Sequence, residues 1–106
     1  MLIALHIEDM VTELGFEVVG PAMRLAPALV MARSEKLDCA ILDINLASER
    51  SFPVADALRD RGIPFIFATG YGSKGLDDAY RDVGTIQKPF RFQDLERAIH
   101  QALGDG

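Results

Sequence analysis

The sequence predicts a single α/β domain in which helices cover both faces of a parallel β-sheet. Segments with helical spacing of apolar residues alternate with short apolar runs, and no repeat or low-complexity linker interrupts them. These runs are apolar at nearly every position, which is typical of strands that are buried on both faces. At 106 residues the chain fits one domain, so we expect 1–106 to fold as a unit.

The first half of the chain is expected to contain two helices and two strands. Apolar residues recur every three or four positions from Leu2 to Leu14, and Gly15 supplies the stop that follows a helix end. The elements expected next are a short strand at 17–19, a helix at 25–36 and a buried strand at 39–42.

The second half continues the alternation. Its expected elements are a helix at 52–61, a strand at 63–68, a weaker helix at 76–81, a short strand at 85–87 and a closing helix at 93–103. Right-handed crossovers between parallel strands bring the carboxyl ends of the strands to one edge of the sheet. Functional sites in this class of fold form at that edge.

Composition and charge exclude several classes of function. The chain has 16 acidic and 11 basic residues, a net charge of −5, which argues against nucleic-acid binding because a phosphate backbone would be repelled. No apolar run is long enough to cross a membrane, and the apolar start lacks the basic flank and cleavage site of a signal peptide, so we expect a cytoplasmic protein. The lone Cys39 cannot form an internal disulfide and is expected to be buried.

Three polar residues follow successive predicted strands: Asp43, Thr69 and Lys88. Taken singly, each is explained by a helix cap or a turn. Together at one sheet edge they suit acyl-phosphate chemistry, in which a carboxylate is the nucleophile while a hydroxyl and an ammonium stabilise the incoming oxygens. Lys88 would gain a charge-assisted contact only once Asp43 carries a phosphoryl group.

The residues around this triad resemble the receiver domains of two-component response regulators. The resemblance lies in Ile41–Leu46, Thr69-Gly70 and Lys88–Phe90, in that order, and it extends from the first residue to about Ala102. It implies a flavodoxin-like (CheY-like) doubly wound sheet. More narrowly, Pro64–Tyr71 resembles the motif of the FAT-GUY receivers, an alphaproteobacterial subgroup often found as stand-alone domains fed by HWE-type or related histidine kinases.

This resemblance implies a set of roles. Asp43 receives a phosphoryl group from a histidine kinase or a phosphotransfer protein, and Thr69 and Lys88 contact it. The backbone carbonyl of Asn45 joins Asp43 in binding Mg²⁺. The bond between Lys88 and Pro89 is cis. The output is phosphorylation-dependent binding of another protein, or the draining of phosphate from a phosphorelay, and not an enzymatic activity.

One departure from the family pattern concerns the start of the chain. A receiver opens with a strand that ends in an acidic pair, which helps the acceptor to hold Mg²⁺, and we expect neither here. Glu8 and Asp9 are candidates for the pair, but the stretch from Asp9 to Gly15 is too short for a crossover, so both are assigned to the solvated side of the first helix. This interpretation makes the chain N-terminally truncated, with Met1 an internal residue of that helix; a genuinely short form is the alternative.

The missing strand has two expected consequences. A central gap leaves unpaired edges, so the chain either dimerises by strand exchange or re-pairing, or the 17–19 strand pairs directly with the 39–42 strand. Weakened Mg²⁺ binding leaves a pseudo-receiver, an interaction module that is not phosphorylated, as the alternative function. A hydrolase with an aspartyl nucleophile is a more distant alternative function. Such a hydrolase needs an acidic residue two positions after its nucleophile, and Asn45, at that position after Asp43, cannot act as an acid.

A second departure concerns output. Thr85 stands where most receivers carry an aromatic switch residue. The signal is then expected to pass through the loop after Thr69, where Gly70 and Gly72 permit large backbone changes. Tyr71 is either a candidate for the aromatic role or an exposed loop residue without a signalling task.

Overall fold

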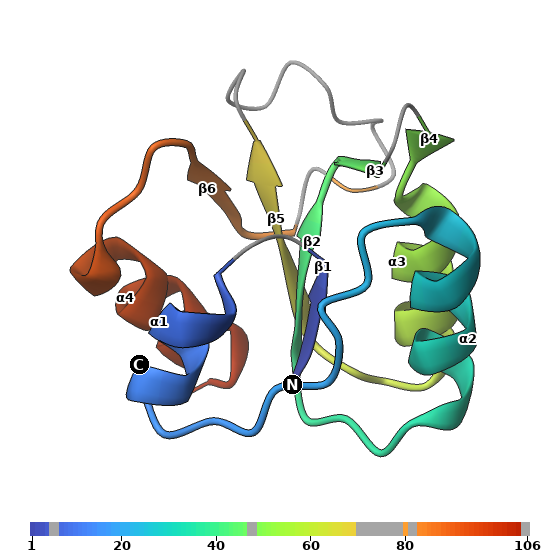
Figure 1. Cartoon of the computed structure of the whole chain (residues 1–106), viewed down its shortest axis with the longest axis horizontal. Helices are drawn as coiled ribbons and strands as arrows, with labels where there is room; N and C mark the ends of the chain where they lie inside the picture. Colours follow the sequence, from blue (N-terminus) through green and yellow to red (C-terminus); the bar gives the residue numbers. More distant parts are fainter. Residues whose placement is uncertain (5–6, 47–48, 70–79, 81–82, 105–106) are drawn as a thin grey trace.

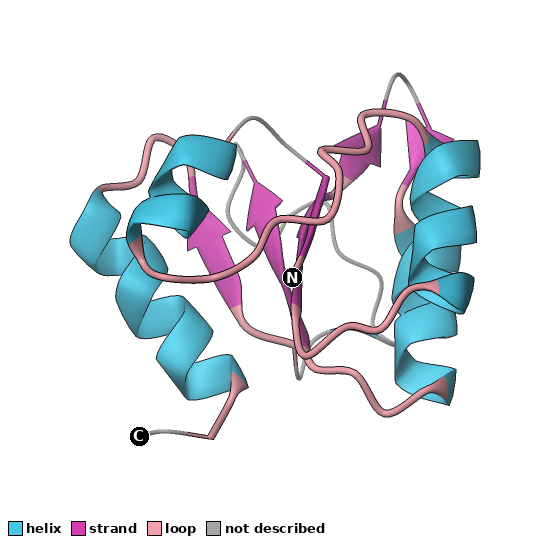
Figure 2. Ribbon diagram, turned by 60° about the horizontal axis from the view of Figure 1, so that its bottom comes forward, coloured by secondary structure: helices cyan, strands magenta, loops and turns pink. Residues whose placement is uncertain are grey.

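The computed structural model contains a four-stranded parallel sheet with helices on both faces (Figure 1). It describes residues 1–4, 7–46, 49–69, 80 and 83–104. The strands, in sheet order, are β1 (Leu2–Ala4), β2 (Ala40–Asp43), β5 (Phe65–Thr69) and β6 (Thr85–Gln87). One face is covered by α2 (Leu25–Ser34) and α3 (Phe52–Asp60), the other by α1 (Glu8–Glu13) and α4 (Phe92–Ala102) (Figure 2). The predicted doubly wound α/β fold is confirmed.

Successive strand residues point into two separate hydrophobic cores. In β1, Leu2 and Ala4 belong to the core under α2 and α3, whereas Ile3 belongs to the core under α1 and α4. All three residues are fully buried. Because burying one Leu or Ile side chain contributes about 1.5–3 kcal/mol, this short strand stabilises both halves of the domain.

The expected helix at 2–14 is wrong in its first part, and the first strand of the sheet is present. Residues Leu2–Ala4 form β1 and pair in parallel with β2. A strand that ended at Asp9 would leave too few residues for a crossover before Gly15. The strand ends at Ala4, so residues 5–18 supply the dozen or so residues that a parallel crossover needs. Backbone pairing decides the conformation, since in a short apolar run the hydrophobic spacing alone does not distinguish helix from strand.

The outer edge of β1 is covered by the segment 17–22. Val19 forms a parallel bridge with Leu2, and its N–H donates to the carbonyl of Met1 at 2.8 Å. The N–H of Ile3 donates to the carbonyl of Val19 at 3.0 Å. The predicted strand around Val19 is therefore reduced to a single bridge, and its direct pairing with β2 is wrong. The central gap, which was the reason to expect strand exchange between two chains, is filled by β1.

The other predicted elements agree with the structure to within a few residues, and β6 has its predicted bounds. The predicted helix at 76–81 lies outside the described residues, apart from Tyr80. A small antiparallel pair, β3 (Asn45–Leu46) and β4 (Glu49–Arg50), was not predicted. In the described part of the chain, no helix is long and apolar enough to cross a membrane.

Helices α2 and α3 pack against each other, and Arg61 joins their ends. The Nη1 of Arg61, which follows the end of α3, donates to the carbonyl of Ala32 at 2.7 Å. That carbonyl lies in the last turn of α2, where carbonyls have no partner within the helix. A side chain just beyond the end of one helix thus supplies a donor for one of the terminal carbonyls of the other.

Gly20 allows the 17–22 segment to approach β1, and this close contact is testable. Its φ is +107°, and a Cβ there would lie 2.8 Å from the nitrogen of Ala22 and 2.9 Å from the carbonyl oxygen of Ile3. Gly15 is a matched control, because its φ is +93° but a Cβ would meet nothing within 4 Å. We expect Gly20→Ala to lower the free energy of urea unfolding by about 1–3 kcal/mol more than Gly15→Ala does. Equal losses would contradict this placement of the segment.

Cys39 is buried directly before β2, as predicted, and burial raises the pKa of its thiol from 9.0 to about 11. The neutral thiol therefore contributes stability that is complete below pH 9 and is lost as the pH rises through 11. We expect Cys39→Ala to lose less stability than the wild type does between these pH values, as measured by urea unfolding. The native thiol should also resist a disulfide reagent at pH 8 until urea unfolds the protein. Rapid reaction of the native protein would show that Cys39 is accessible.

Candidate functional site

The carboxyl ends of three strands bring the predicted site residues to one edge of the sheet. Asp43 ends β2, Thr69 ends β5, and Lys88 follows β6. The register sets Ala68 opposite Asp43 and Gln87 opposite Thr69. The N–H of Lys88 also donates to the carbonyl of Thr69 at 2.8 Å, so backbone hydrogen bonding fixes the relative height of these residues.

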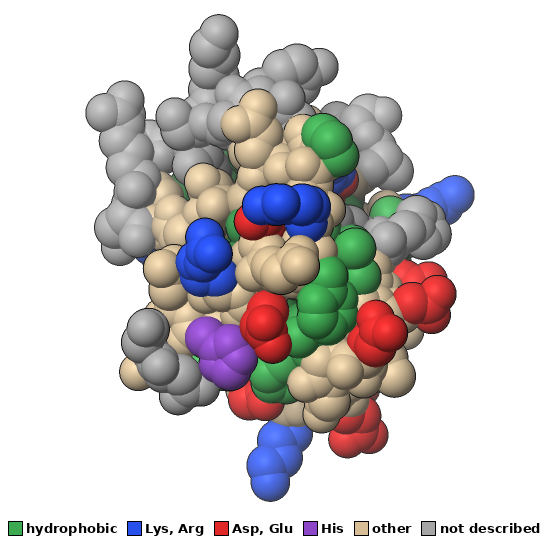
Figure 3. Space-filling view, turned by 90° about the vertical axis from the view of Figure 1, so that its left-hand side faces the viewer, with side chains coloured by type: hydrophobic (Ala, Val, Ile, Leu, Met, Phe, Trp, Pro, Cys, Tyr) green, Lys and Arg blue, Asp and Glu red, His purple; other side chains and the backbone are tan. Residues whose placement is uncertain are grey.

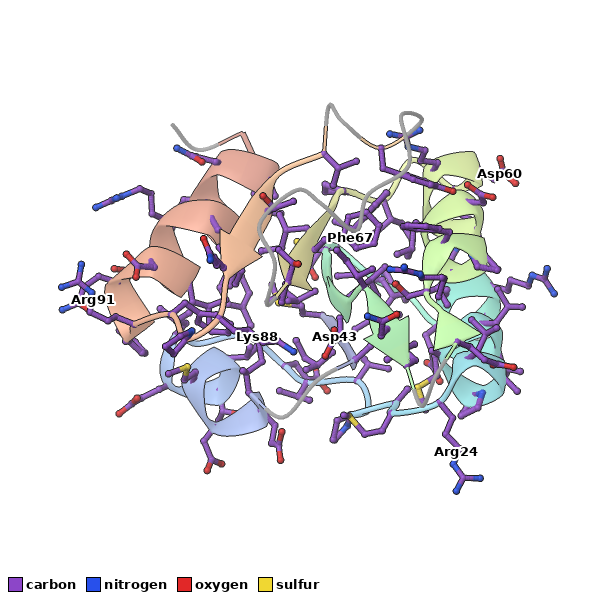
Figure 4. All side chains as sticks on the ribbon, turned by 90° about the horizontal axis from the view of Figure 1, so that it is seen from above. Arg24, Asp43, Asp60, Phe67, Lys88 and Arg91 are labelled. Atoms are coloured by element: carbon purple, nitrogen blue, oxygen red, sulfur yellow. The ribbon has the colours of Figure 1, made fainter. Side chains whose placement is uncertain are left out.

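Asp43 is held by donors on both carboxylate oxygens. Its Oδ2 lies 2.5 Å from the Nζ of Lys88, and its Oδ1 accepts a hydrogen bond from the backbone N–H of Asn45 at 3.3 Å. The expectation that Lys88 gains a charged contact only after phosphorylation is therefore wrong, because Lys88 already contacts the unmodified carboxylate. Figure 4 looks down on this edge and shows Asp43 and Lys88 turned toward one another, with Arg24 and Arg91 pointing outward. The side chains of Asp43 and Lys88 are 23% and 39% exposed, so a reactant can reach the pair from solvent.

The turn that carries Lys88 contains a cis peptide bond and leads into the capped start of α4. The Lys88–Pro89 bond is cis, as the resemblance implies, and a second cis bond, Gly20–Pro21, was not predicted. At the start of α4, the backbone N–H of Arg91 donates to Asp94 at 3.1 Å, and this hydrogen bond lowers the pKa of the Asp94 carboxyl. Thr69 itself is buried, while the candidate switch residues Gly70, Tyr71 and Gly72 lie outside the described residues.

A pocket of about 520 Å³ opens beside the ion pair, between the start of α1 and the turn after β6. Its wall combines charged and apolar side chains: Ile7, Glu8, Asp9, Met10, Met23, Asp43, Lys88, Pro89 and Phe90. Hydrophobic side chains also form a stripe, with acidic side chains beside it, on the face made by α1 and α4 (Figure 3). Met10, Leu14 and Phe90 are partly buried and pack against the core beneath α1 and α4.

Curated proteins of similar sequence are regulators. The chain is 35% identical to the phyllosphere-induced regulator PhyR of Methylorubrum extorquens over an alignment of 106 residues that covers 96% of this chain. Over the same share it is 29% identical to the transcriptional regulatory protein PdtaR of Mycobacterium tuberculosis. The chain spans 40% of PhyR and 52% of PdtaR. A scan against models of known protein families finds no match.

Solved structures match most of this chain and most of their own length. SdrG from Sphingomonas melonis Fr1 is 41% identical, with a TM-score of 0.80, over 92% of this chain and 82% of SdrG. The REC domain of the response regulator PhyR from Erythrobacter litoralis is 30% identical, with a TM-score of 0.78, over 92% and 78%. This chain belongs to the response-regulator receiver domains.

Less similar receivers share the fold alone. The receiver domain of the sensor histidine kinase PA1611 from Pseudomonas aeruginosa PAO1 is 21% identical, with a TM-score of 0.73, over 92% of this chain and 85% of that domain. Its structure has a magnesium ion coordinated in the active-site cleft.

The oxygen donors in the pocket of this receiver suit the same class of cation. Carboxylates of Asp43, Glu8 and Asp9 line the pocket. Across the described residues, no three His, Cys, Asp or Glu side chains come together as a group that could hold a metal ion. Mg²⁺, however, commonly binds through one or two carboxylates and completes its shell with water and phosphate oxygens. The donor set therefore fits Mg²⁺ without a third acidic ligand.

Glu8 is the residue that sequence reasoning misplaced. Both Glu8 and Asp9 lie in the first helix, as predicted, and the predicted solvated side is right for Asp9, which is exposed. Glu8 is only half-buried overall, yet its Oε2 is fully buried without a hydrogen-bond partner. The misplacement follows from the wrong start of the helix, because α1 begins at Glu8 and its first turn lies at the functional edge of the sheet.

The Asp43–Lys88 pair should contribute little to stability, because both side chains are partly exposed and solvent screens them. We expect Lys88→Met to change the free energy of urea unfolding by less than about 1 kcal/mol. A loss of several kcal/mol would show that the pair holds the fold together and does not primarily serve the site.

Proposed function

We propose that this receiver accepts a phosphoryl group on Asp43 from a phosphohistidine and signals through the resulting change. The observation that carries the proposal is the contact between Asp43 and Lys88 at the carboxyl edge of the sheet, with Thr69 ending the neighbouring strand. In this arrangement a partly exposed nucleophile lies beside a cation and a hydroxyl-bearing residue.

The transfer requires a balanced exchange of bonds. A carboxylate oxygen of Asp43 forms a bond to phosphorus as the bond between phosphorus and the imidazole nitrogen of the donor breaks, and the imidazole keeps the electron pair and takes up a proton. Lys88 then binds phosphoryl oxygens, which carry more charge than the carboxylate did. Thr69 donates its hydroxyl to another of these oxygens. The modified and unmodified forms thus differ in what Lys88 and Thr69 contact.

Asp43 and the backbone carbonyl of Asn45 would hold Mg²⁺ in this receiver. When bound, the ion offsets the repulsion between the carboxylate and the phosphoryl oxygens. The magnesium ion in the PA1611 receiver supports this assignment at the level of the shared fold.

The partners we propose are proteins. The motif Pro64–Tyr71 favours the FAT-GUY subgroup and thus an HWE-type or related histidine kinase, or a phosphotransfer protein, as donor. The hydrophobic stripe over α1 and α4 offers a surface for protein binding (Figure 3). The output is either phosphorylation-dependent binding or the draining of phosphate from a relay, without an enzymatic activity of its own. Each of these roles suits a cytoplasmic protein.

A pseudo-receiver is the second candidate, favoured by one observation. The two residues that follow β1 are Leu5 and His6, where the family pattern has an acidic pair. A receiver with too weak a hold on Mg²⁺ keeps the fold and the binding surface but is not phosphorylated. The two functions differ only in whether Asp43 reacts.

Phosphorylation is tested by adding acetyl phosphate or beryllofluoride with Mg²⁺ and recording amide NMR spectra. We expect shifts centred on Asp43, Thr69 and Lys88, because the bound group displaces the present contacts of these residues. The control is Asp43→Asn, which keeps the size of the side chain and removes the nucleophile. The chain is a pseudo-receiver if the amide spectrum of the folded wild type does not change under either treatment.

A further inference from the structure

We propose that Tyr80 couples the acceptor site to the outer surface of α3, and that its hydrogen bond to Asp56 holds the receiver in its unmodified arrangement. The inference rests on the proposed function, because the coupling acts only when Asp43 changes its state. It gives a coupling route to a chain that has Thr85 where most receivers carry an aromatic switch residue.

A row of buried side chains leads toward the acceptor edge of the sheet. Side chains two residues apart in a strand point to the same face, so Phe65, Phe67 and Thr69 share one face of β5. Phe65 and Phe67 belong to the core under α2 and α3. Phe67 also lies opposite Leu42 of β2, the residue before Asp43. A change in the packing of Phe67 therefore reaches the strands that carry Thr69 and Asp43.

The ring of Tyr80 packs against this row. It lies edge-to-face with Phe67, with ring centres 5.8 Å apart, and it stacks on Phe52 of α3 at 4.7 Å. Phe52 also meets Phe67 edge-to-face at 5.9 Å, so each of the three rings contacts the other two. Tyr80 and Phe67 are buried. Closely packed rings have few alternative arrangements, so a change at Phe67 requires a change at Tyr80.

The hydroxyl of Tyr80 extends from this cluster to the surface of α3. It donates to Oδ1 of Asp56 at 2.5 Å. The guanidinium of Arg59, one turn further along the helix, lies 5.1 Å from the centre of the Tyr80 ring. Asp56 and Arg59 are both exposed. One side chain thus joins solvent-facing charges of α3 to the row that ends at Thr69.

These contacts belong to the unmodified receiver, in which Lys88 lies against Asp43. Hydrogen bonds to a charged group are stronger than neutral ones, so the bond between Tyr80 and Asp56 stabilises the arrangement that contains it. A phosphoryl group on Asp43 draws the hydroxyl of Thr69 toward it and so changes the end of the row. The modified arrangement therefore forms at the expense of the packing around Tyr80, and loosening that packing favours it.

The test is the affinity for beryllofluoride with Mg²⁺, measured on the whole chain by amide NMR titration. Tyr80→Phe keeps the ring and removes only the hydroxyl, whereas Asp56→Asn keeps the size of the acceptor and removes its charge. We expect each variant to bind beryllofluoride about three- to tenfold more tightly than the wild type. The double variant should match Tyr80→Phe, because once the hydroxyl is gone the change at Asp56 has no further bond to weaken.

Two control variants separate coupling from other effects. Asp60→Asn makes the same chemical change at an exposed carboxylate that points outward from the end of α3 (Figure 4). Cys39→Ala leaves a small cavity at the opposite end of β2 from Asp43 and reports on general loss of stability. Both should bind beryllofluoride as the wild type does. A merely structural role would make Tyr80→Phe resemble Cys39→Ala, with weaker resistance to urea and no tighter binding.

Unchanged or weaker binding by either Tyr80→Phe or Asp56→Asn, in folded protein, overturns the proposal. Tighter binding that Asp60→Asn or Cys39→Ala shows to the same degree also overturns it. If Tyr80→Phe does not fold, Asp56→Asn decides, because its change lies at the surface.

Failure of the proposed function gives a different result. If the wild type binds beryllofluoride and the variants match it, the coupling fails and the proposed function stands. If none of the proteins binds it, the proposed function fails, and the unmodified chain decides the coupling. Tyr80→Phe must then shift the amide signals of 42–43 and 67–69 as well as those of α3, and shifts confined to α3 overturn it.

Discussion

The rest of the structure depends on the backbone pairing of β1, which lies between β2 and the segment around Val19. The N–H of Leu2 donates to the carbonyl of Cys39 at 3.1 Å on one side, and the N–H of Ile3 donates to Val19 on the other. Buried backbone groups must be paired, so without this strand both neighbours would keep unsatisfied donors and acceptors. The same residues also fill both hydrophobic cores. One short strand therefore sustains the sheet and both helical layers.

The pairing also determines the chemistry of the functional edge. Strand ends are rigid positions, so Asp43 and the backbone that precedes Lys88 are held by the ladder and not by flexible loops. The contact between Asp43 and Lys88 means that the acceptor carboxylate already has a cation beside it before any phosphoryl group arrives. Phosphorylation would exchange one partner of that ammonium for another, which couples the covalent state of the acceptor to the position of a neighbouring side chain.

Much of this was predictable because buried strands and amphipathic helices leave different patterns in a sequence. The apolar run before Asp43 and the Lys88-Pro89 turn each marked the carboxyl end of a strand, and so they located the functional edge of the sheet. The strand conformation of Leu2–Ala4 was not predictable, because three apolar residues fit a helix as well as a strand. Their backbone pairing with β2 on one side and Val19 on the other determines the conformation. The partial burial of Glu8 was not predictable for the same reason, because the direction of its side chain depends on where the helix begins. The β3–β4 pair carries no apolar pattern to reveal it.

The hydrogen bond from Arg61 to the carbonyl of Ala32 has a consequence for how this sequence can diverge. Deleting one residue from α3 would rotate everything after the deletion by about 100° around the helix axis and swing the guanidinium away from α2. The lengths of the two helices are therefore not independent during evolution. Insertions and deletions in one should be accompanied by compensating changes in the other, whereas substitutions on their outer faces remain free to accumulate.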